Sequence, residues 1–225
     1  METPRQDAGA SATAKDRARP PPLPRWVLPA ESPLAVEVAA AAERILSEIS
    51  AAPDAEKLAF LCDTRAAHRV IFTIVAPADL PEAAGSYRGT PGSALEGARR
   101  AVFSARRVPG LKLRDMCTPP DEVLPEMTAL AARIAQIWSD PPAGEARFDA
   151  LAEIVARFLR CHPYLDGNGH ICRMMADVLA RRLGLSVATD WRPAPRPYDH
   201  HMSLCLQWYP HHPLLLACYL RKWFA

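Results

Sequence analysis

The chain has 225 residues, 49% of them hydrophobic, and a formal net charge of +2 at pH 7. This length suits one substantial domain, alone or with a tail, and so small a net charge gives no reason to expect a nucleic-acid partner. The sequence contains no apolar run near the ~18 residues of a membrane-spanning helix, so we expect no membrane partner.

Residues 1–30 are rich in Ala, Pro, Arg and small polar residues, with a proline-rich run from Pro20 to Pro24. Because little apolar surface is available there to offset the entropy of ordering, we expect a disordered tail. The proline run is interpreted as a stiff solvated linker, with a polyproline ligand as the alternative.

Two predicted segments follow the tail. Ser32 and Pro33 are typical of a helix start, with a hydroxyl N-cap and proline at the first helical position, and the helix should run to about Ile49. We expect residues 31–76 to form N-terminal helices that pack on a core made by residues 77–225.

A second helix is predicted over residues 55–75, capped by Asp54. Residues 70–75 are rich in β-branched side chains, so a strand there is the alternative. Residues 77–98 are rich in turn-forming glycines. Residues 102–113 alternate roughly between apolar and polar and are broken by a Pro-Gly pair, which favours a small β-hairpin over an irregular loop.

Helical spacing of apolar residues predicts five further helices, over about residues 118–138, 145–162, 170–183, 198–208 and 213–223. Gly184 is typical of the left-handed residue that follows a helix. The predicted fold class is therefore all-α: a helical bundle with one small β-hairpin, built around a central helix pair that a glycine-bearing loop joins.

Six dispersed cysteines, several of them on apolar helical faces, predict reduced, buried thiols rather than a disulfide framework: Cys62, Cys117, Cys161, Cys172, Cys205 and Cys218. Together with the lack of an apolar secretory signal, this favours a cytoplasmic protein. A secretion address in the N-terminal tail stays open, so a secreted effector that acts in a host cytosol is the alternative.

The loop between the central helices carries most of the chemistry. Pro163 disfavours helical geometry at His162, so the incoming helix should end there. Gly167 and Gly169 bracket Asn168, and the next helix starts at once. A glycine-bearing turn that feeds a helix N-terminus favours anions, because backbone N–H groups and the helix dipole face the ligand.

This stretch resembles the signature of the Fic domain family, H-P-F-x-[D/E]-G-N-G-R-x-x-R. Seven residues match in order, with Tyr164 in place of Phe: His162, Pro163, Asp166, Gly167, Asn168, Gly169 and Arg173. Upstream, the run from Gly85 to Arg88 is similar to the family's G-x-Y-R. The resemblance covers roughly residues 60–225 and implies a Fic-like helical bundle with a hairpin flap.

The resemblance implies a protein adenylyltransferase, which transfers AMP from the co-substrate ATP to a hydroxyl of a target protein. It implies that His162 is the general base and that Asp166 holds Mg²⁺. The implied phosphate-binding residues are Gly167, Asn168, Gly169, His170 and Arg173. The alternatives are structural: a satisfied histidine, an Asx-type cap of the glycine turn and a surface helix arginine.

His170 departs from the pattern, because the family has an arginine there that contacts the triphosphate tail. Histidine is shorter and mostly neutral at pH 7. The resemblance therefore leaves two alternatives open: transfer of another nucleotidyl or phosphate-containing group, or a catalytically weak nucleotide-binding interaction module. A zinc site is a further alternative, but Cys161, His162, His170 and Cys172 lack zinc-ligand spacing.

The resemblance also implies partners. The flap near Val102–Leu113 would hold an extended segment of the target protein by backbone pairing. Glu96 lies in a run that loosely resembles the inhibitory motif of many Fic proteins, although it falls on the wrong side of the G-x-Y-R match. Regulation by a separate protein and formation of a homodimer are both compatible with the family.

Overall fold

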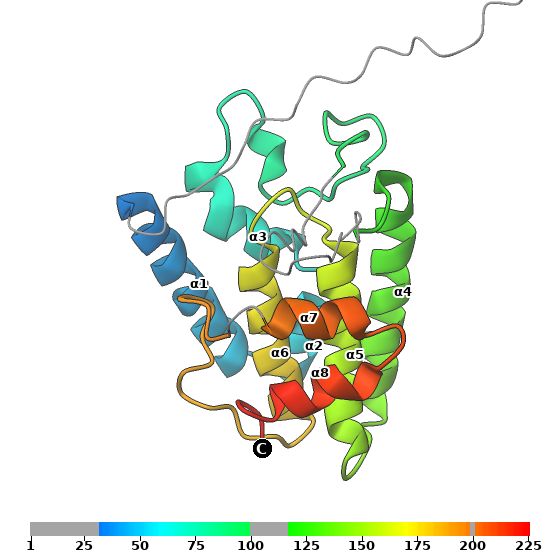
Figure 1. Ribbon diagram of the computed structural model, residues 1–225. Coiled ribbons are helices and arrows are strands. Elements are labelled where there is room, and N and C mark those ends of the chain that lie inside the picture. The colour runs from blue at the N-terminus through cyan, green and yellow to red at the C-terminus, as the bar shows by residue number, and fades with distance from the viewer. Residues whose placement is uncertain (1–31, 100–116, 199–200) are drawn as a thin grey trace, which may run out of the picture.

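The computed structural model of the chain describes residues 32–99, 117–198 and 201–225. Within those ranges the protein is all-α, as the sequence predicts, apart from two short 3₁₀ turns and one isolated bridge between Val187 and Phe224. Figure 1 shows the helices: α1 (Pro33–Ala51), α2 (Asp54–Cys62), α3 (Arg65–Phe72), α4 (Pro120–Ser139), α5 (Ala146–Cys161), α6 (Asn168–Arg182), α7 (His201–Trp208) and α8 (Pro213–Leu220). The expected tail (residues 1–30) and hairpin (102–113) lie outside the described residues.

Helix α1 begins as predicted. The Ser32 hydroxyl accepts a hydrogen bond from the backbone N–H of Ala35 at 3.2 Å, and Pro33 occupies the first helical position. The helix buries Val38 and Ala42 and contacts α2, α3 and α6, so it packs on the rest of the bundle.

The prediction of one helix over residues 55–75 was wrong. The chain forms α2, breaks at Asp63 and Thr64, and resumes as α3, followed by a 3₁₀ turn over Thr73–Val75. The Asp63 carboxylate accepts from both the backbone N–H of Arg65 (3.1 Å) and its guanidinium (2.6 Å). This local capping competes with helical hydrogen bonding, and a new helix starts at Arg65. The alternative of a strand over residues 70–75 was also wrong.

Helices α5 and α6 form the predicted central pair. Both are buried along most of their length, and α5 also packs against α4 and α8, while α6 contacts α1 and α2. Figure 1 shows α6 between α1 on one side and α5 and α4 on the other. Gly184 follows α6 with φ +69°, and the Leu185 N–H donates to the Ala180 carbonyl at 2.9 Å, which closes the helix as predicted.

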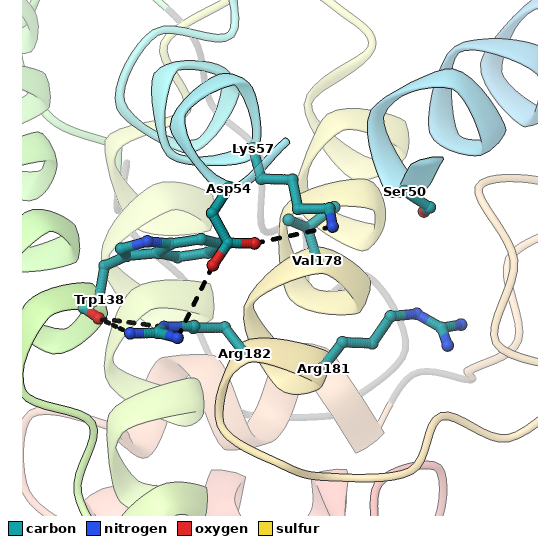
Figure 2. A pocket seen from close by; sticks show the side chains of 7 residues that line it. All are labelled: Ser50, Asp54, Lys57, Trp138, Val178, Arg181 and Arg182. Carbon is teal, nitrogen blue, oxygen red and sulfur yellow. Dashed lines mark hydrogen bonds and ion pairs between the residues drawn. The ribbon is translucent and has the colours of Figure 1, made fainter. Parts of the chain in front are cut away.

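The far end of α6 is tied to its neighbours by charged side chains around a cavity of about 210 Å³ (Figure 2). The Arg182 guanidinium donates to the Trp138 carbonyl (2.6 Å) and lies over the indole ring at 5.1 Å. Asp54 lies 3.9 Å from Arg182 and 3.8 Å from Lys57. Among the described residues that line the cavity, one is an acid and three are cations: Asp54, Lys57, Arg181 and Arg182. Because Arg182 of α6 contacts Asp54 of α2 and the Trp138 carbonyl of α4, we interpret the cavity as a junction of these three helices.

None of the six cysteines, all of which lie in the described residues, forms a disulfide. Among the described helices, none is both long and apolar enough to cross a membrane.

Candidate functional site

His162 lies at the carboxyl end of α5 in a strained conformation. Its backbone is left-handed (φ 51°, ψ 60°), and its N–H donates to the Phe158 carbonyl at 2.9 Å. A residue other than glycine costs about 1–2 kcal/mol in this conformation, and such strain is concentrated at functional sites. Pro163 prevents the helix from continuing, so the predicted end of the helix is confirmed and His162 is its C-cap.

The guanidinium of Arg88 holds this helix end. It is fully buried and donates to four backbone carbonyls, those of His162 (2.7 Å), Cys161 (2.8 Å), Ala98 (2.9 Å) and Thr118 (3.1 Å). A cation is favourable there, because the carboxyl end of a helix carries partial negative charge. Ala98 and Thr118 lie on either side of residues 100–116, so one side chain joins His162 to described residues before and after that segment.

Behind the loop lies a buried aromatic layer. Tyr164 is completely buried; its hydroxyl lies 2.7 Å from that of Thr64, and its ring stacks on His68 at a centroid distance of 3.7 Å. His68 Nδ1 accepts from the Gly85 N–H at 2.9 Å, and Nε2 lies 3.0 Å from the Asp166 carbonyl oxygen. Since Gly85 can only donate and the carbonyl can only accept, His68 is the neutral tautomer with the proton on Nε2.

The environment of His68 opposes protonation. Burial lowers its pKa to about 4, an effect that its contact with the Asp166 carbonyl only partly offsets. A second proton on Nδ1 would face the Gly85 N–H. We therefore interpret His68 as a positioning residue that joins α3 to the backbone of the loop.

Position 167 requires glycine. Its φ is +76°, and an added Cβ would lie 2.5 Å from the Phe72 ring and 3.0 Å from His68 Nε2. The loop can therefore approach α3 closely only because residue 167 lacks a side chain. Helix α6 begins at the next residue.

Asn168 is turned into the loop. Its Oδ1 accepts from the Tyr164 N–H, and its Nδ2 donates to the Tyr164 carbonyl, both at 2.9 Å. Asn168 is 2% exposed, and this pair of bonds closes the turn between Tyr164 and α6. In this geometry Asn168 shapes the loop, in addition to any contact with a phosphate.

A cavity of about 640 Å³ lies against this loop. It has three walls: the loop and first turns of α6, the start of α1, and the segment from Ala194 to Tyr198. Five of the seven predicted site residues line it together: Asp166, Gly167, Gly169, His170 and Arg173. His162 and Asn168 are not part of its wall, since His162 caps α5 and Asn168 faces inward.

Asp166 is half-buried on the cavity wall. One carboxylate oxygen accepts from the N–H of the adjacent Gly167 at 2.7 Å, a bond to the next residue and not the two-residue Asx turn considered from the sequence; α6 has no side-chain cap. The same carboxylate faces the cavity as a hard oxygen ligand. The two roles are compatible, because an ionised carboxylate offers two oxygens.

Arg173 is buried, not a surface helix arginine. Its Nε donates to the Pro193 carbonyl at 2.8 Å, its Nη2 contacts the same oxygen, and its Nη1 donates to the Tyr198 hydroxyl at 3.1 Å. These bonds engage three of the five N–H groups of a guanidinium. An added Cβ on Gly169 would lie 3.1 Å from Arg173 Nη1, so the cation sits against the first turn of α6.

His170 carries little positive charge. Its ring meets the Phe72 ring edge-on at 5.6 Å. Burial, followed by the charges of Arg173 and Arg196, lowers the pKa of His170 to about 4. The imidazole is therefore neutral at pH 7 and offers at most one N–H donor.

Two alternatives find no support in the site. Within the described ranges, no three His, Cys, Asp or Glu side chains gather in a way that could hold a metal, so the zinc alternative lacks a ligand set. The Glu96 carboxylate accepts from the Gly92 N–H at 3.1 Å and so closes its own turn.

Sequence patterns alone did not predict several of these contacts. The sequence marks Arg88 as part of the run from Gly85, but it does not predict that Arg88 binds the carbonyls at the end of α5. His68 belongs to no motif that the sequence analysis identified. Arg196 and Tyr198 come more than twenty residues after the loop in the sequence. Only the fold brings them to it.

Comparisons with known proteins support the sequence resemblance. A family model described as the Fic/DOC family matches residues 64–180. A crystal structure of the N-terminal Fic domain of a VirB-translocated Bep effector protein from Bartonella quintana is similar, with a TM-score of 0.59 and 18% identity over 85% of this chain and 80% of that one. At this identity the likeness shows the fold alone. No curated protein gives a significant match.

Proposed function

The chain belongs to the Fic/DOC family, and we propose that it is a protein adenylyltransferase, which transfers AMP from ATP to a Ser, Thr or Tyr hydroxyl of a target protein. A Fic-type transferase in general follows from the family. The observation that carries the finer proposal is the cavity that gathers Asp166, Gly169 and Arg173 at the loop that begins with His162.

His162 acts as the general base in this proposal. The acceptor oxygen attacks the α-phosphorus of ATP, its proton passes to His162, and the bond to the bridging oxygen breaks to release pyrophosphate. Histidine suits the step, because its ordinary pKa lies near neutrality. The Arg88 bond to the His162 carbonyl supports this role, since it fixes the backbone that carries the imidazole.

The phosphates would lie against the first turn of α6. Backbone N–H groups and the positive end of the helix dipole favour anions there. Arg173 adds a buried cation beside Gly169, already fixed by Pro193 and Tyr198, so little entropy is lost when it binds. A pre-positioned cation can stabilise the charge that develops on the phosphate in the transition state.

Asp166 fits a magnesium ion. Mg²⁺ is usually held by one or two carboxylates together with substrate phosphates and waters, and Asp166 supplies one carboxylate on the cavity wall. When bound, the ion would neutralise charge on the phosphates. The Gly167 N–H holds the carboxylate in place meanwhile.

The target would bind at the flap near residues 102–113. An extended target segment pairing with the flap backbone would bring its hydroxyl to His162. Arg88 supports this arrangement, because it binds the carbonyls of Ala98 and Thr118 on either side of that segment. We place the reaction in a reducing cytosol. Because the similar Bartonella quintana protein is described as VirB-translocated, a host cytosol is the second candidate.

Transfer of label to proteins of a lysate tests the function. ATP labelled at the α-phosphate should label a target with Mg²⁺ present, whereas γ-labelled ATP should not. The His162→Ala variant should lose the signal, and His211→Ala, which changes an exposed histidine, should keep it. Label that persists in His162→Ala would reject the mechanism.

A second candidate is transfer of another nucleotidyl or phosphate-containing group. The neutral state of His170 favours it, because position 170 then lacks the cation that the family places there for the triphosphate. The same assay with UTP, GTP, CTP and a phosphocholine donor separates the two candidates. Stronger labelling from one of these donors than from ATP would replace the first proposal. Binding without any transfer would identify a nucleotide-binding interaction module.

A further inference from the structure

Arg196 is a second cation at the candidate nucleotide cavity and, unlike the buried Arg173, it is exposed. It lies in the segment from Ala194 to Tyr198, outside the glycine loop, yet it lines the same cavity as Asp166 and Arg173. Among the described residues that line this cavity, two are arginines and one is an acid. The wall therefore has a surplus of positive charge, which suits a ligand with several negative charges.

Tyr198 holds the two arginines in a fixed relation. The guanidinium carbon of Arg196 lies 5.9 Å from the centre of the Tyr198 ring, and that of Arg173 lies 5.7 Å from the same centre. Contact with an aromatic face restricts a guanidinium without using up its hydrogen-bond donors. The side chain of Arg196 is thus exposed at the cavity, and its contact with Tyr198 restricts its conformation.

Arg173 also anchors the segment that carries Arg196. It binds the Pro193 carbonyl and the Tyr198 hydroxyl, while its own carbonyl accepts from the indole N–H of Trp191 at 3.0 Å. Trp191 is buried against Phe224 at a ring distance of 4.7 Å. The bonds on both sides of Arg196 set its distance from the loop.

His170 lies between these cations and the loop. Arg173 and Arg196 line the same cavity as His170, where the family resemblance calls for an arginine at position 170. A neutral imidazole cannot supply the charge of that missing residue. A cation from another segment of the chain can supply that charge.

We infer that Arg196 takes the place of the absent motif arginine and, together with Arg173, binds the terminal phosphates of the donor. The inference rests on the proposed function insofar as the donor is a nucleoside triphosphate. It deepens that function by assigning a residue from a distant segment to recognition of the polyphosphate tail. The α-phosphate and the acceptor remain with the loop.

Binding to the full chain tests this with three probes: ATP, AMP and inorganic tripolyphosphate, each titrated calorimetrically. Arg196→Gln should weaken ATP and tripolyphosphate binding about tenfold or more, and AMP binding less than about twofold. The matched control is Arg192→Gln, an exposed arginine of the same connection that donates to the Thr189 carbonyl. It should bind all three probes as the wild type does.

A rescue experiment sharpens the result. His170→Arg combined with Arg196→Gln should recover most of the lost tripolyphosphate affinity, because it restores a cation at the same end of the cavity. Equal tripolyphosphate affinity in wild type and Arg196→Gln would overturn the inference, as would a wild type that binds neither ATP nor tripolyphosphate. An equal loss for AMP would also overturn it. If transfer fails but tripolyphosphate binding depends on Arg196, the proposed function fails and the inference stands.

Discussion

The Nε of Arg88 donates to the carbonyl oxygen of His162 at 2.7 Å, which ties the candidate general base to a fully buried cation seventy-four positions earlier in the chain. The same guanidinium binds three further carbonyls. A buried charge is tolerated only when such bonds replace its hydration. The strained left-handed backbone of His162 therefore has a specific partner that maintains it.

Arg88→Ala should lower the free energy of unfolding by about 3 kcal/mol or more, because it leaves buried carbonyls without donors. Arg88→Lys keeps the charge but not the planar fork and should lose part of that amount. Urea denaturation midpoints measure both. Exposed Arg192→Ala is the control and should stay within about 0.5 kcal/mol of the wild type. A similarly small change in Arg88→Ala would show that water or other groups replace the guanidinium.

Gly167→Ala should destabilise the protein more than Gly92→Ala. Both glycines have φ above +70°, so both substitutions carry the left-handed cost of about 1–2 kcal/mol. Only at Gly167 would the new Cβ meet the Phe72 ring, at 2.5 Å, whereas Gly92 has nothing within 4 Å. The difference in melting temperature between the two variants isolates the contact between loop and α3. Equal melting temperatures would mean that α3 moves aside at little cost.

The helix boundaries that frame the site could be predicted because capping residues and prolines next to each boundary determine them. Ser32 with Pro33 marks the start of α1, Pro163 marks the end of α5, and Gly184 marks the end of α6. The break at Asp63 escaped prediction because neither glycine nor proline marks it. There, a carboxylate bonds to the backbone two residues on and competes with an otherwise helical sequence.

The longer contacts could not be read from any periodicity. Arg88 reaches His162, and Arg173 reaches Pro193 and Tyr198, only after α5, α6 and their connections have packed. Hydrophobic spacing predicts which faces of the helices are buried but not which buried polar groups meet. The roles of His68, Arg88 and Arg196 therefore come from the fold.

Stability should fall as the pH drops from about 6.5 to 4, and His68 should contribute to this fall. Its pKa is about 4 in the folded protein, below the ordinary value of 6.5, so the unfolded chain takes up the proton first. The contribution is fully present above pH 6.5 and is lost by pH 4, with a size of about 3 kcal/mol.

Urea denaturation at several pH values measures this in the wild type and in His68→Gln, which does not titrate. The variant should be less stable at pH 7 but should lose less stability than the wild type between pH 6.5 and 4. Parallel curves for the two proteins would show that His68 takes up its proton in the folded protein as readily as in the unfolded chain.

Asp166→Asn should lower Mg²⁺-dependent transfer about a hundredfold, because the amide is a weaker ligand for a hard cation. Removal of Mg²⁺ by a chelator should have at least as large an effect on the wild type. Asp190→Asn, at an exposed aspartate outside the cavity, is the control and should keep full activity. ATP affinity without Mg²⁺ should not fall in Asp166→Asn. Full transfer activity in that variant would remove Asp166 from the metal site and leave it only its bond to Gly167.

His170→Arg should raise kcat/KM with ATP, by about tenfold if it adds one charged contact to the triphosphate. The new side chain can extend into the cavity that His170 already lines, away from Phe72. His170→Gln, which adds no charge, is the matched control and should give no gain. Because Arg196 lies at the same end of the cavity, the gain should be larger in Arg196→Gln than in the wild-type background. Equal or lower activity of His170→Arg in both backgrounds would show that the cavity is built for a donor other than ATP.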